Sequence, residues 1–277
     1  MTDRLLMLLR KLPRRIQTSL YHRFLANHQS WYAAKFNAAR LSYEPSVVMQ
    51  LSPADGFHGE IALFGLYEEE LTKLLHGIAK DRGGLLLDVG ANYGYFSLLW
   101  CGARCENQAA AIEASPANAG PLRHNVTLNR LEERISVREW AASNYEGCVT
   151  FNLGSHEETG WGGIATSASN VAPPTNAEAG QNLMVTVPCH RLDAAFPEQE
   201  IAVLKIDCEG ADAWVIEGAA ELLAGKRVRH VFFEENLYRQ SQLGIQPSTA
   251  LRMLERYGYQ WESLGDEPGI QNFHAWF

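Results

Sequence analysis

The sequence LLLDVGANYG at residues 85–94 decides the fold of this 277-residue chain. Residues 85–89 form a short and nearly continuous apolar run, which is typical of a parallel strand buried on both faces. Asp88 lies near the end of this run, and Gly90 and Gly94 then mark a turn before the next helical segment. Because glycine lets backbone amides approach a ligand closely, the turn predicts a site for a nucleotide or nucleoside.

The pattern of strand, turn and helix repeats along the rest of the chain. Short apolar stretches predict further core strands at residues 109–113, 135–141, 203–207 and 228–234. Helical periodicity predicts helices at residues 66–81, 116–129, 213–224 and 248–257, and another that begins over 96–101. Two closing antiparallel strands are expected at residues 259–264 and 272–277. The alternation predicts an α/β fold with a doubly wound, mostly parallel, seven-stranded sheet that binds ligands at the carboxyl ends of its strands.

One segment interrupts this alternation between the third and fourth core strands. Residues 148–153 and 184–189 are predicted to form an inserted β-hairpin, and residues 154–182 between them are rich in Gly, Ser, Ala, Asn and Pro. A long loop inside a compact domain is commonly functional. We expect a flap over the site from which His156 and Trp161 contact the substrate, although each is equally interpretable as a surface residue.

The N-terminal part differs in charge from the remainder. Residues 1–40 contain eight Lys and Arg residues and a single acid. Helices are predicted at 4–12 and 15–42, which divides the chain into a basic helical extension at residues 1–57 and a main domain at 58–277. The interpretation we favour is an arm that packs on the domain or on a second subunit of a homo-oligomer. The alternative is a basic amphipathic helix that lies on an anionic membrane surface.

The overall composition excludes several classes of protein. The formal net charge is −8 despite the basic extension, so the main domain is strongly acidic. The acidic domain is unsuited to binding a nucleic acid, because such binding requires Lys and Arg side chains to neutralise the phosphates. The five cysteines include no CxxC pair, and we expect them to be reduced. Neither a membrane span nor a secretory signal is recognisable, so a cytoplasmic protein is expected.

A carboxylate ends the second core strand. Glu113 lies in the sequence AIEASP at residues 111–116. A carboxylate at this place accepts two hydrogen bonds from the vicinal hydroxyls of a ribose. Together with the glycine turn it predicts a ribose-bearing cofactor, and the alternative interpretation is a solvated acid at a strand end.

Charged side chains also end the fourth and fifth core strands. Lys205, Asp207 and Glu209 end the fourth strand, and Glu234 and Glu235 end the fifth. Asp207 and Glu209 are candidates for cofactor contact, for a general base or for a metal ligand, and Glu209 is alternatively a helix cap. Lys205 is expected to pair with a neighbouring carboxylate. The carboxylate oxygens of Asp207, Glu234 and Glu235 are suitable ligands for Mg²⁺. The equal alternative is that a glutamate at this place serves only to form hydrogen bonds with the backbone or the substrate.

With these motifs the sequence resembles the FkbM-type methyltransferase family over residues 58–240. The stretches that carry the resemblance are FGLYE at 64–68, DVGANYG at 88–94, EASP at 113–116 with Asn125 and Asn129, AAS at 141–143, LD at 192–193, and KIDCEGA at 205–211. The first glycine motif and the KIDCEG motif together are far more specific than either alone. Cys208 and Asp212 stand where Val and Glu are commoner in the family, and these conservative departures leave the assignment unchanged.

The resemblance implies a Rossmann-like class I methyltransferase fold, S-adenosylmethionine as cofactor, and O-methylation of a small molecule such as a sugar, a glycolipid or a natural product. The cofactor pocket that it implies consists of Glu68, Asp88, Gly90, Ala91, Asn92, Gly94, Glu113, Ala114, Ser115, Trp140, Ala141 and Asp207. Asp88 would orient the amino-acid end of the cofactor, and Trp140 and Ala141 would flank the adenine. Candidates for catalysis on the acceptor hydroxyl are Asp207, Glu234 and Glu235, with His58 or His156 as further candidate bases.

Two other functions agree with parts of the sequence. A nicotinamide-dependent oxidoreductase is disfavoured because the turn lacks GxGxxG spacing and an acid precedes its glycines. A methyltransferase-like scaffold without activity would instead bind a partner through the basic extension. Binding of S-adenosylmethionine, its demethylated product and NAD distinguishes these alternatives.

Overall fold

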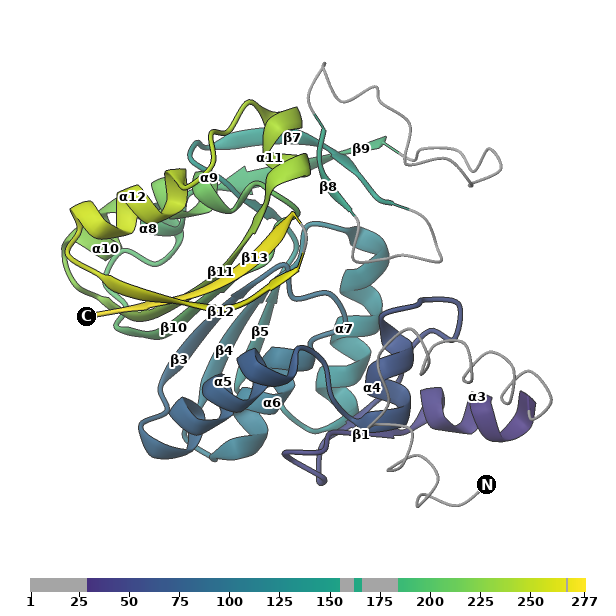
Figure 1. Ribbon diagram of the computed structural model, residues 1–277. Coiled ribbons are helices and arrows are strands. Elements are labelled where there is room, and N and C mark those ends of the chain that lie inside the picture. Colours follow the sequence, from purple (N-terminus) through teal and green to yellow (C-terminus); the bar gives the residue numbers. More distant parts are fainter. Residues whose placement is uncertain (1–28, 155–161, 166–183, 268) are drawn as a thin grey trace.

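A seven-stranded sheet forms the centre of the molecule (Figure 1). The computed structural model describes residues 29–154, 162–165, 184–267 and 269–277. The strands of the sheet, in spatial order, are β12 (Gln260–Glu267), β13 (Ile270–Trp276), β11 (Val228–Asn236), β10 (Ile201–Ile206), β3 (Leu85–Val89), β4 (Gln108–Ile112) and β5 (Ile135–Arg138). The strands from β11 to β5 are parallel, whereas β13 and β12 close the sheet in antiparallel orientation. The predicted α/β fold with a mostly parallel, seven-stranded sheet is confirmed.

The strand order reverses next to β3. From β3 the chain adds β4 and β5 on one side, and it then returns to place β10 and β11 on the other. Leu86 and Leu87 in β3 have no exposed surface, as expected for a central strand. Ligands of doubly wound sheets bind in the crevice that such a reversal opens at the carboxyl ends of the strands. The ends of β3, β4 and β10 therefore position the site.

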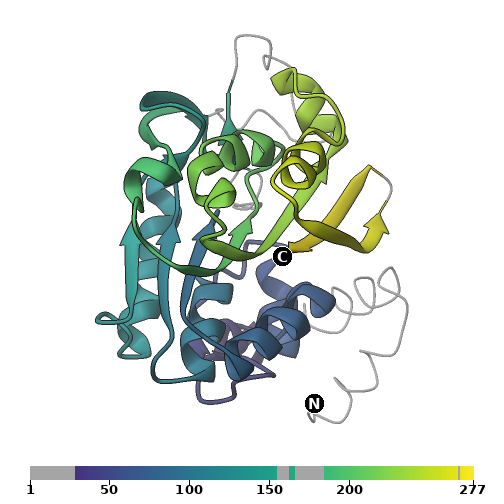
Figure 2. The ribbon, with the colours of Figure 1, turned by 90° about the vertical axis from the view of Figure 1, so that its left-hand side faces the viewer.

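Helices cover both faces of the sheet (Figures 1 and 2). One face carries α5 (Glu69–Asp81), α6 (Tyr95–Ala103) and α7 (Pro116–Leu128). The other carries α8 (Leu192–Ala195), α9 (Asp212–Glu217), α10 (Ala220–Ala224) and α12 (Thr249–Arg256), while α11 (Leu237–Leu243) follows β11. Each face has an apolar core of its own, one around Leu98 of α6 and the other around Leu222 of α10. The central strands are thus buried on both faces, which explains their continuous apolar sequences.

The helix predicted over residues 213–224 is divided in two. α9 ends at Glu217 and α10 begins at Ala220. At Gly218, between them, a Cβ atom would lie 2.0 Å from the carbonyl oxygen of Ser143. This contact between distant parts of the backbone accompanies the break, and the periodicity of the segment does not reveal it.

A second sheet has the strand order β6 (Ala141–Ala142), β9 (Met184–His190), β7 (Gly147–Asn152) and β8 (Gly163–Ile164). The antiparallel pairing of β7 with β9 confirms the inserted hairpin. The strand predicted at 135–141 is wrong at its end, because β5 stops at Arg138 and Ala141 pairs with β9 in the second sheet. Most of the predicted flap, including His156 and Trp161, lies outside the described residues.

The described part of the predicted N-terminal extension packs against the main domain. It forms α3 (Gln29–Asn37), β1 (Ala39–Arg40) and β2 (Val48–Met49), ahead of α4 (His58–Phe64). Phe36, Leu41 and Met49 are buried in the same core as α5 and α6. The helix predicted at 15–42 extends too far, because α3 ends at Asn37 and a strand follows. The remainder of the basic arm, residues 1–28, is outside the described residues. Among the helices that the structure describes, none has the length and apolar character needed to cross a membrane.

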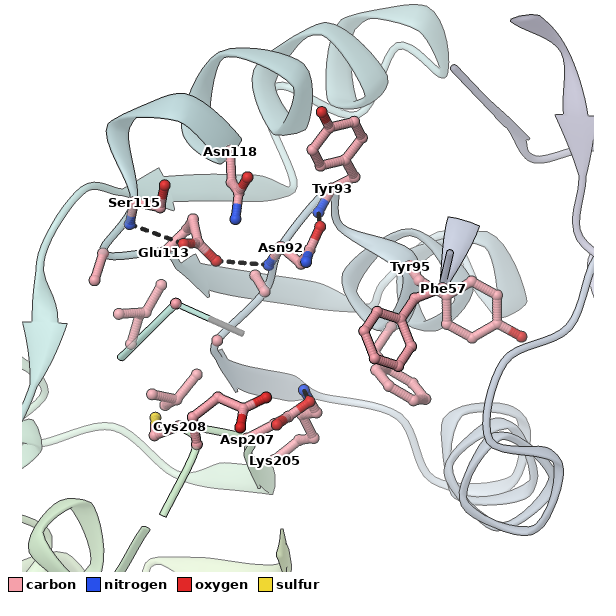
Figure 3. Close-up of a pocket in the computed structure, with 18 of the residues that line it drawn as sticks. Phe57, Asn92, Tyr93, Tyr95, Glu113, Ser115, Asn118, Lys205, Asp207 and Cys208 are labelled. Carbon is pink, nitrogen blue, oxygen red and sulfur yellow. Dashed lines mark hydrogen bonds and ion pairs between the residues drawn. The ribbon is translucent and has the colours of Figure 1, made fainter. Parts of the chain in front are cut away.

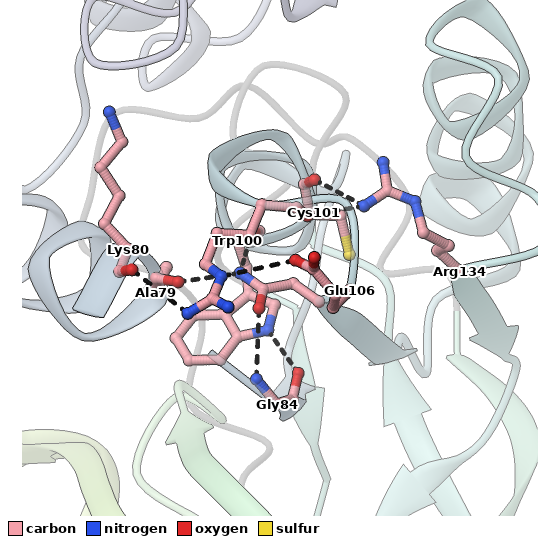
Figure 4. Close-up of polar contacts among 9 residues, drawn as sticks. Ala79, Lys80, Gly84, Trp100, Cys101, Glu106 and Arg134 are labelled. Atoms are coloured by element: carbon pink, nitrogen blue, oxygen red, sulfur yellow. Dashed lines mark hydrogen bonds and ion pairs between the residues drawn. The ribbon is translucent and has the colours of Figure 1, made fainter. Parts of the chain in front are cut away.

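Side chains that bond to backbone carbonyls hold α6 at the amino end of the sheet (Figure 4). Trp100 Nε1 donates to the carbonyl oxygen of Gly84 over 3.0 Å. Arg134 Nη1 donates to the carbonyl oxygens of Cys101 and Arg104, each over 2.8 Å, and satisfies acceptors at the end of the helix. These bonds anchor the helix that begins at the glycine turn.

Candidate active site

A cavity of about 370 Å³ lies where β3, β4, β10 and β11 end (Figure 3). The predicted site residues that line it are Gly90, Ala91, Asn92, Glu113, Ala114, Ser115, Trp140, Ala141, Asp207 and Glu234. The described residues that were predicted for the site but do not line it are Glu68, Asp88, Gly94 and Glu235. The cavity has the size of a small-molecule site and lies at the reversal of strand order.

The turn after β3 touches the end of β10. Gly90 has a φ of +75°, and a Cβ atom there would lie 1.9 Å from the carbonyl oxygen of Asp207. The amides of Gly90 and Ala91 donate to the carbonyl oxygen of Ile112 at the end of β4. A residue without a side chain is therefore required where these strands meet. Gly94 immediately precedes α6. A Cβ atom at Gly94 would lie 2.5 Å from the side chain of Leu122.

Glu113 projects from the end of β4 toward this turn (Figure 3). Its Oε2 accepts a hydrogen bond from the amide of Asn92 over 2.7 Å, and its Oε1 accepts one from the amide of Ser115 over 2.8 Å. Burial raises the pKa of Glu113 to about 7, although both amides act in the opposite direction. Because each carboxylate oxygen has more than one lone pair, the side chain can also accept hydroxyl groups of a ribose.

Apolar walls adjoin Glu113. Trp140, Ala141 and Phe151 line the cavity, and Ala141 and Phe151 belong to an apolar cluster against which Ala114, next to Glu113, packs. We call these residues and Glu113 the nucleoside end. Two further lining residues were not predicted from the sequence. Phe151 lies in the inserted strand β7, and Asn118 lies in α7, from which its side chain forms a hydrogen bond with Glu113. These walls suit a flat heteroaromatic base.

Asp88 lies behind the cavity, fully buried. Its Oδ2 accepts hydrogen bonds from the amide of Ser97 over 3.0 Å and from the hydroxyl of Ser97 over 2.7 Å. Its Oδ1 has no hydrogen-bond partner among the described residues and lies 3.8 Å from Lys205 Nζ. Asp88 thus lies beside Lys205 and does not line the cavity, and its role in orienting the cofactor stays a prediction.

Lys205 is a buried cation between two carboxylates. Its Nζ lies 3.3 Å from Asp207 Oδ2 and 5.1 Å from the ring centre of Phe96. Burial by itself lowers the pKa of Lys205, but the carboxylates of Asp207, Asp88 and Glu68 more than compensate and raise it above its ordinary value. The ammonium stays charged, as the predicted pairing with a carboxylate requires.

Carboxyl groups crowd the wall beside Lys205. Asp207, Glu209 and Glu234 all line the cavity. Burial, followed by the charge of Asp207, raises the pKa of Glu209 to about 8, even though Arg239 Nε lies 3.8 Å from Glu209 Oε2. The same causes raise the pKa of Glu234 far above its usual range. Three carboxyl groups and a single ammonium group line this wall, so it favours a cationic ligand.

Asp212 ties the two strand ends that carry these acids. It is fully buried at the start of α9. Its Oδ2 accepts a hydrogen bond from the amide of Cys208 over 3.3 Å, and its Oδ1 accepts one from the amide of Glu234 over 3.1 Å. Burial and the charge of Asp207 raise the pKa of Asp212 to about 7. Asp212, which stands where Glu is commoner in the family, thus holds the ends of β10 and β11 together.

The position of Glu235 argues against the predicted catalytic role. Successive side chains of a strand point to opposite faces, so Glu235 turns away when Glu234 faces the cavity. Its Oε2 accepts a hydrogen bond from the amide of Ser248 over 3.2 Å. In the part of the chain that the structure describes, no three His, Cys, Asp or Glu side chains are grouped to hold a metal ion. The predicted Mg²⁺ set of Asp207, Glu234 and Glu235 is not assembled.

Aromatic side chains line the cavity on the side of Tyr95 and Phe57, away from Glu113 (Figure 3). The rings of Tyr95 and Phe96 meet edge to face with centres 5.0 Å apart, and those of His58 and Tyr93 lie 4.3 Å apart. We call Phe57, His58, Tyr93, Tyr95 and Phe96 the aromatic end. Of these, only His58 was a candidate site residue from the sequence, because the rings come from separate segments without a shared motif.

Glu68 lies in a smaller hollow that adjoins the acidic wall and is also lined by Lys205, Asp207 and Glu234. Its backbone is left-handed, with a φ of +45°, as are those of Asn92 and Glu209. Such conformations are uncommon for residues other than glycine and concentrate at functional sites. Glu68 influences the site by charge and raises the pKa of Lys205.

The site fits S-adenosylmethionine in three respects. Glu113 offers carboxylate oxygens for the ribose, and the nucleoside end is apolar where the adenine is expected. The crowded carboxyl groups of Asp207, Glu209 and Glu234 suit a molecule that carries a sulfonium and an ammonium charge. The cavity of about 370 Å³ also has the size of a small-molecule site.

A doubly wound sheet in this order, with a glycine turn after β3 and a buried acid after β4, defines a class I S-adenosylmethionine-dependent methyltransferase. Comparison of the sequence with protein families leads to the same class. The methyltransferase FkbM domain matches residues 88–261. The chain belongs to this family, and the resemblance that the motifs indicated is confirmed.

Several solved structures share parts of this architecture. A precorrin-6y C5,15-methyltransferase from Geobacter metallireducens is 11% identical, with 75% of this chain and 88% of that chain covered and a TM-score of 0.42. The human methyltransferase 10 domain containing protein is 12% identical, with coverage of 76% and 80% and a TM-score of 0.39. TrmK of M. capricolum, solved with S-adenosylhomocysteine, is 10% identical, with coverage of 73% and 66% and a TM-score of 0.40. No curated protein matches the sequence, so the family match carries the assignment.

Proposed function

We propose that this methyltransferase transfers the methyl group of S-adenosylmethionine to a hydroxyl group of a small molecule. The observation that supports this proposal best is the position of Asp207 and Glu234, whose carboxyl groups line the same cavity as Glu113. The bound cofactor supplies an electrophilic methyl group on its sulfonium. The protein then has to orient the acceptor and remove its proton.

Asp207 is the general base in this proposal. Its Oδ2 is held by Lys205 Nζ at 3.3 Å, and its side chain keeps 28% exposure toward the cavity. Lys205 fixes the carboxylate of Asp207, which leaves Oδ1 to accept the proton of the acceptor hydroxyl.

Glu234 has a different role because of its raised pKa. A carboxyl group that keeps its proton near neutral pH can donate a hydrogen bond to the acceptor as well as accept one. Glu234 thereby orients the acceptor next to Asp207. The amide of Glu234 is in turn held by Asp212, which fixes its position relative to β10.

Methyl transfer from labelled cofactor tests the proposal. The protein is incubated with S-adenosylmethionine that carries a deuterated methyl group and with a mixture of small hydroxyl compounds, and products are analysed by mass spectrometry. We expect a labelled methyl ether, at least about 100-fold less of it with Asp207→Asn, and unchanged turnover with the exposed control Asp81→Asn. Full activity of Asp207→Asn would remove that residue from the mechanism. Cofactor binding without transfer of the methyl group to any hydroxyl would favour the inactive scaffold. A labelled methyl group on a nitrogen atom would contradict O-methylation and favour N-methylation.

A further inference from the structure

The aromatic end of the cavity differs in character from the nucleoside end. Tyr95 and Phe96 are buried and packed against each other, and Tyr95 is fixed by a hydrogen bond of 3.2 Å between its hydroxyl and that of Thr72. Phe57 is instead 40% exposed while its side chain lines the cavity. The rings thus form a rigid apolar surface with one accessible member at its edge.

The ionisable side chains beside the aromatic end are almost all acidic. Asp207, Glu209 and Glu234 line the cavity, and their mutual repulsion contributes to the raised pKa values of Glu209 and Glu234. Among the described lining residues, Lys205 is the one cationic side chain, and it already lies within 4 Å of Asp207 and Asp88. A further anion would enter a wall that already disfavours negative charge on its own carboxyl groups, without a cation free to pair with it.

We propose that the aromatic end is an acceptor subsite that takes an apolar ring carrying no charge or a positive charge, and that it rejects anionic acceptors such as phosphorylated molecules. This inference rests on the proposed function, because it assigns the acceptor to the aromatic end and the cofactor to the nucleoside end. Apolar rings gain contact with flat aromatic side chains, and cations gain further from the negative faces of these rings. Repulsion by the carboxylates disfavours the anion.

Three probes of similar shape and different charge test this subsite. Benzyltrimethylammonium, benzyl alcohol and benzoate are each titrated, by ligand-observed NMR, against protein saturated with S-adenosylhomocysteine. The saturating ligand keeps the nucleoside end filled, so that a probe does not report on the cofactor site. We expect the cation and the alcohol to bind at least about tenfold more tightly than benzoate, because like charges at short range cost several-fold in affinity or more.

Two variants locate the binding. Phe57→Ala should lower the affinity for the cation and for the alcohol about three- to tenfold, because it removes an aromatic face from the subsite. Trp261→Ala is the matched control, since Trp261 is 41% exposed, lies on β12 and does not line the cavity. Asp207→Asn should reduce the discrimination against benzoate, because it removes the carboxylate whose charge acts on Glu209 and Glu234. S-adenosylhomocysteine binding is measured for every variant, so that misfolding is recognised.

The outcomes separate this inference from the proposed function. Benzoate that binds as tightly as the alcohol, or probe binding that Phe57→Ala leaves unchanged, would overturn the subsite while methyl transfer to a hydroxyl could still be observed. Failure of S-adenosylhomocysteine to bind the native protein would instead contradict the function on which the inference rests.

Discussion

Gly90 is the residue at which two strand ends touch. A methyl group at this position would lie 1.9 Å from the carbonyl oxygen of Asp207, and the φ of +75° is strained for alanine. Gly90→Ala should therefore reduce the free energy of unfolding by about 2 to 4 kcal/mol and weaken S-adenosylhomocysteine binding. Urea unfolding and calorimetry measure the two effects.

Gly77 provides the control for this substitution. It lies inside α5, where a Cβ atom would meet nothing within 4 Å. Gly77→Ala should raise the free energy of unfolding by about 0.5 to 1 kcal/mol, because alanine is the better helix former, and should leave cofactor binding unchanged. Equal effects of the two substitutions would show that the contact with Asp207 is not what requires glycine.

The sequence predicted the residues of the site better than their roles. The glycine turn and Glu113 lie where the motifs place them, because strand ends of a parallel sheet share one edge. Asp88 and Glu235 do not line the cavity, since side-chain direction depends on tertiary packing that motif spacing does not encode. The aromatic end comes from segments that only folding brings together.

At the scale of elements, Asp212 joins the ends of β10 and β11 through the amides of Cys208 and Glu234. Asp212→Ala leaves both buried amides without their acceptor, and it should lower the free energy of unfolding by about 2 to 3 kcal/mol. It should also weaken S-adenosylhomocysteine binding, because the acidic wall loses its fixed position. The exposed residue Asp81 supplies the control Asp81→Ala, and an effect no larger than that of the control would contradict this role.

Asp212→Asn removes the charge and keeps one of the two acceptor oxygens. Burial raises the pKa of Asp212 to about 7, so its ionisation costs stability as the pH rises through that value. An asparagine does not ionise. We expect the stability of Asp212→Asn to fall less than that of the native protein between pH 5.5 and 8.5, as measured by urea unfolding at both pH values. An identical loss in the two proteins would assign the pH dependence to other groups.

Element boundaries were predicted best where local sequence decides them. Residues 85–89 form β3 as expected, because a buried parallel strand needs a continuous apolar run. The end of β5 and the break between α9 and α10 were not predicted, since pairing with β9 and contact with Ser143 determine them. Both depend on contacts between residues far apart in the sequence, which periodicity cannot reveal.

At the scale of the whole molecule, acidic groups with raised pKa values concentrate around the cavity. The pKa values of Glu113 and Asp212 are raised to about 7 and that of Glu209 to about 8, in each case chiefly by burial. These groups bind protons more tightly in the folded than in the unfolded chain. Their stabilising contribution is therefore complete below about pH 4 and is lost as the pH rises toward 8.

Thermal unfolding across this pH range tests the charge distribution. The melting temperature of the ligand-free protein should fall by several degrees between pH 5.5 and 8.5, because each unit by which a pKa is raised costs about 1.4 kcal/mol once the group ionises. S-adenosylmethionine should offset the loss more than S-adenosylhomocysteine, since only the former carries the sulfonium charge. A melting temperature that rises with pH would contradict this account.

Calorimetric titration with S-adenosylhomocysteine tests the central claim most directly, because it asks whether the cavity at the ends of β3 and β4 holds the cofactor of a methyltransferase. The account predicts binding to the native protein and a loss of about 10- to 100-fold in affinity for Glu113→Gln, because this variant replaces the carboxylate that we expect to bind the ribose. The exposed control Glu133→Gln should bind like the native protein. Absence of binding to the native protein, or equal affinity for Glu113→Gln, would contradict the account.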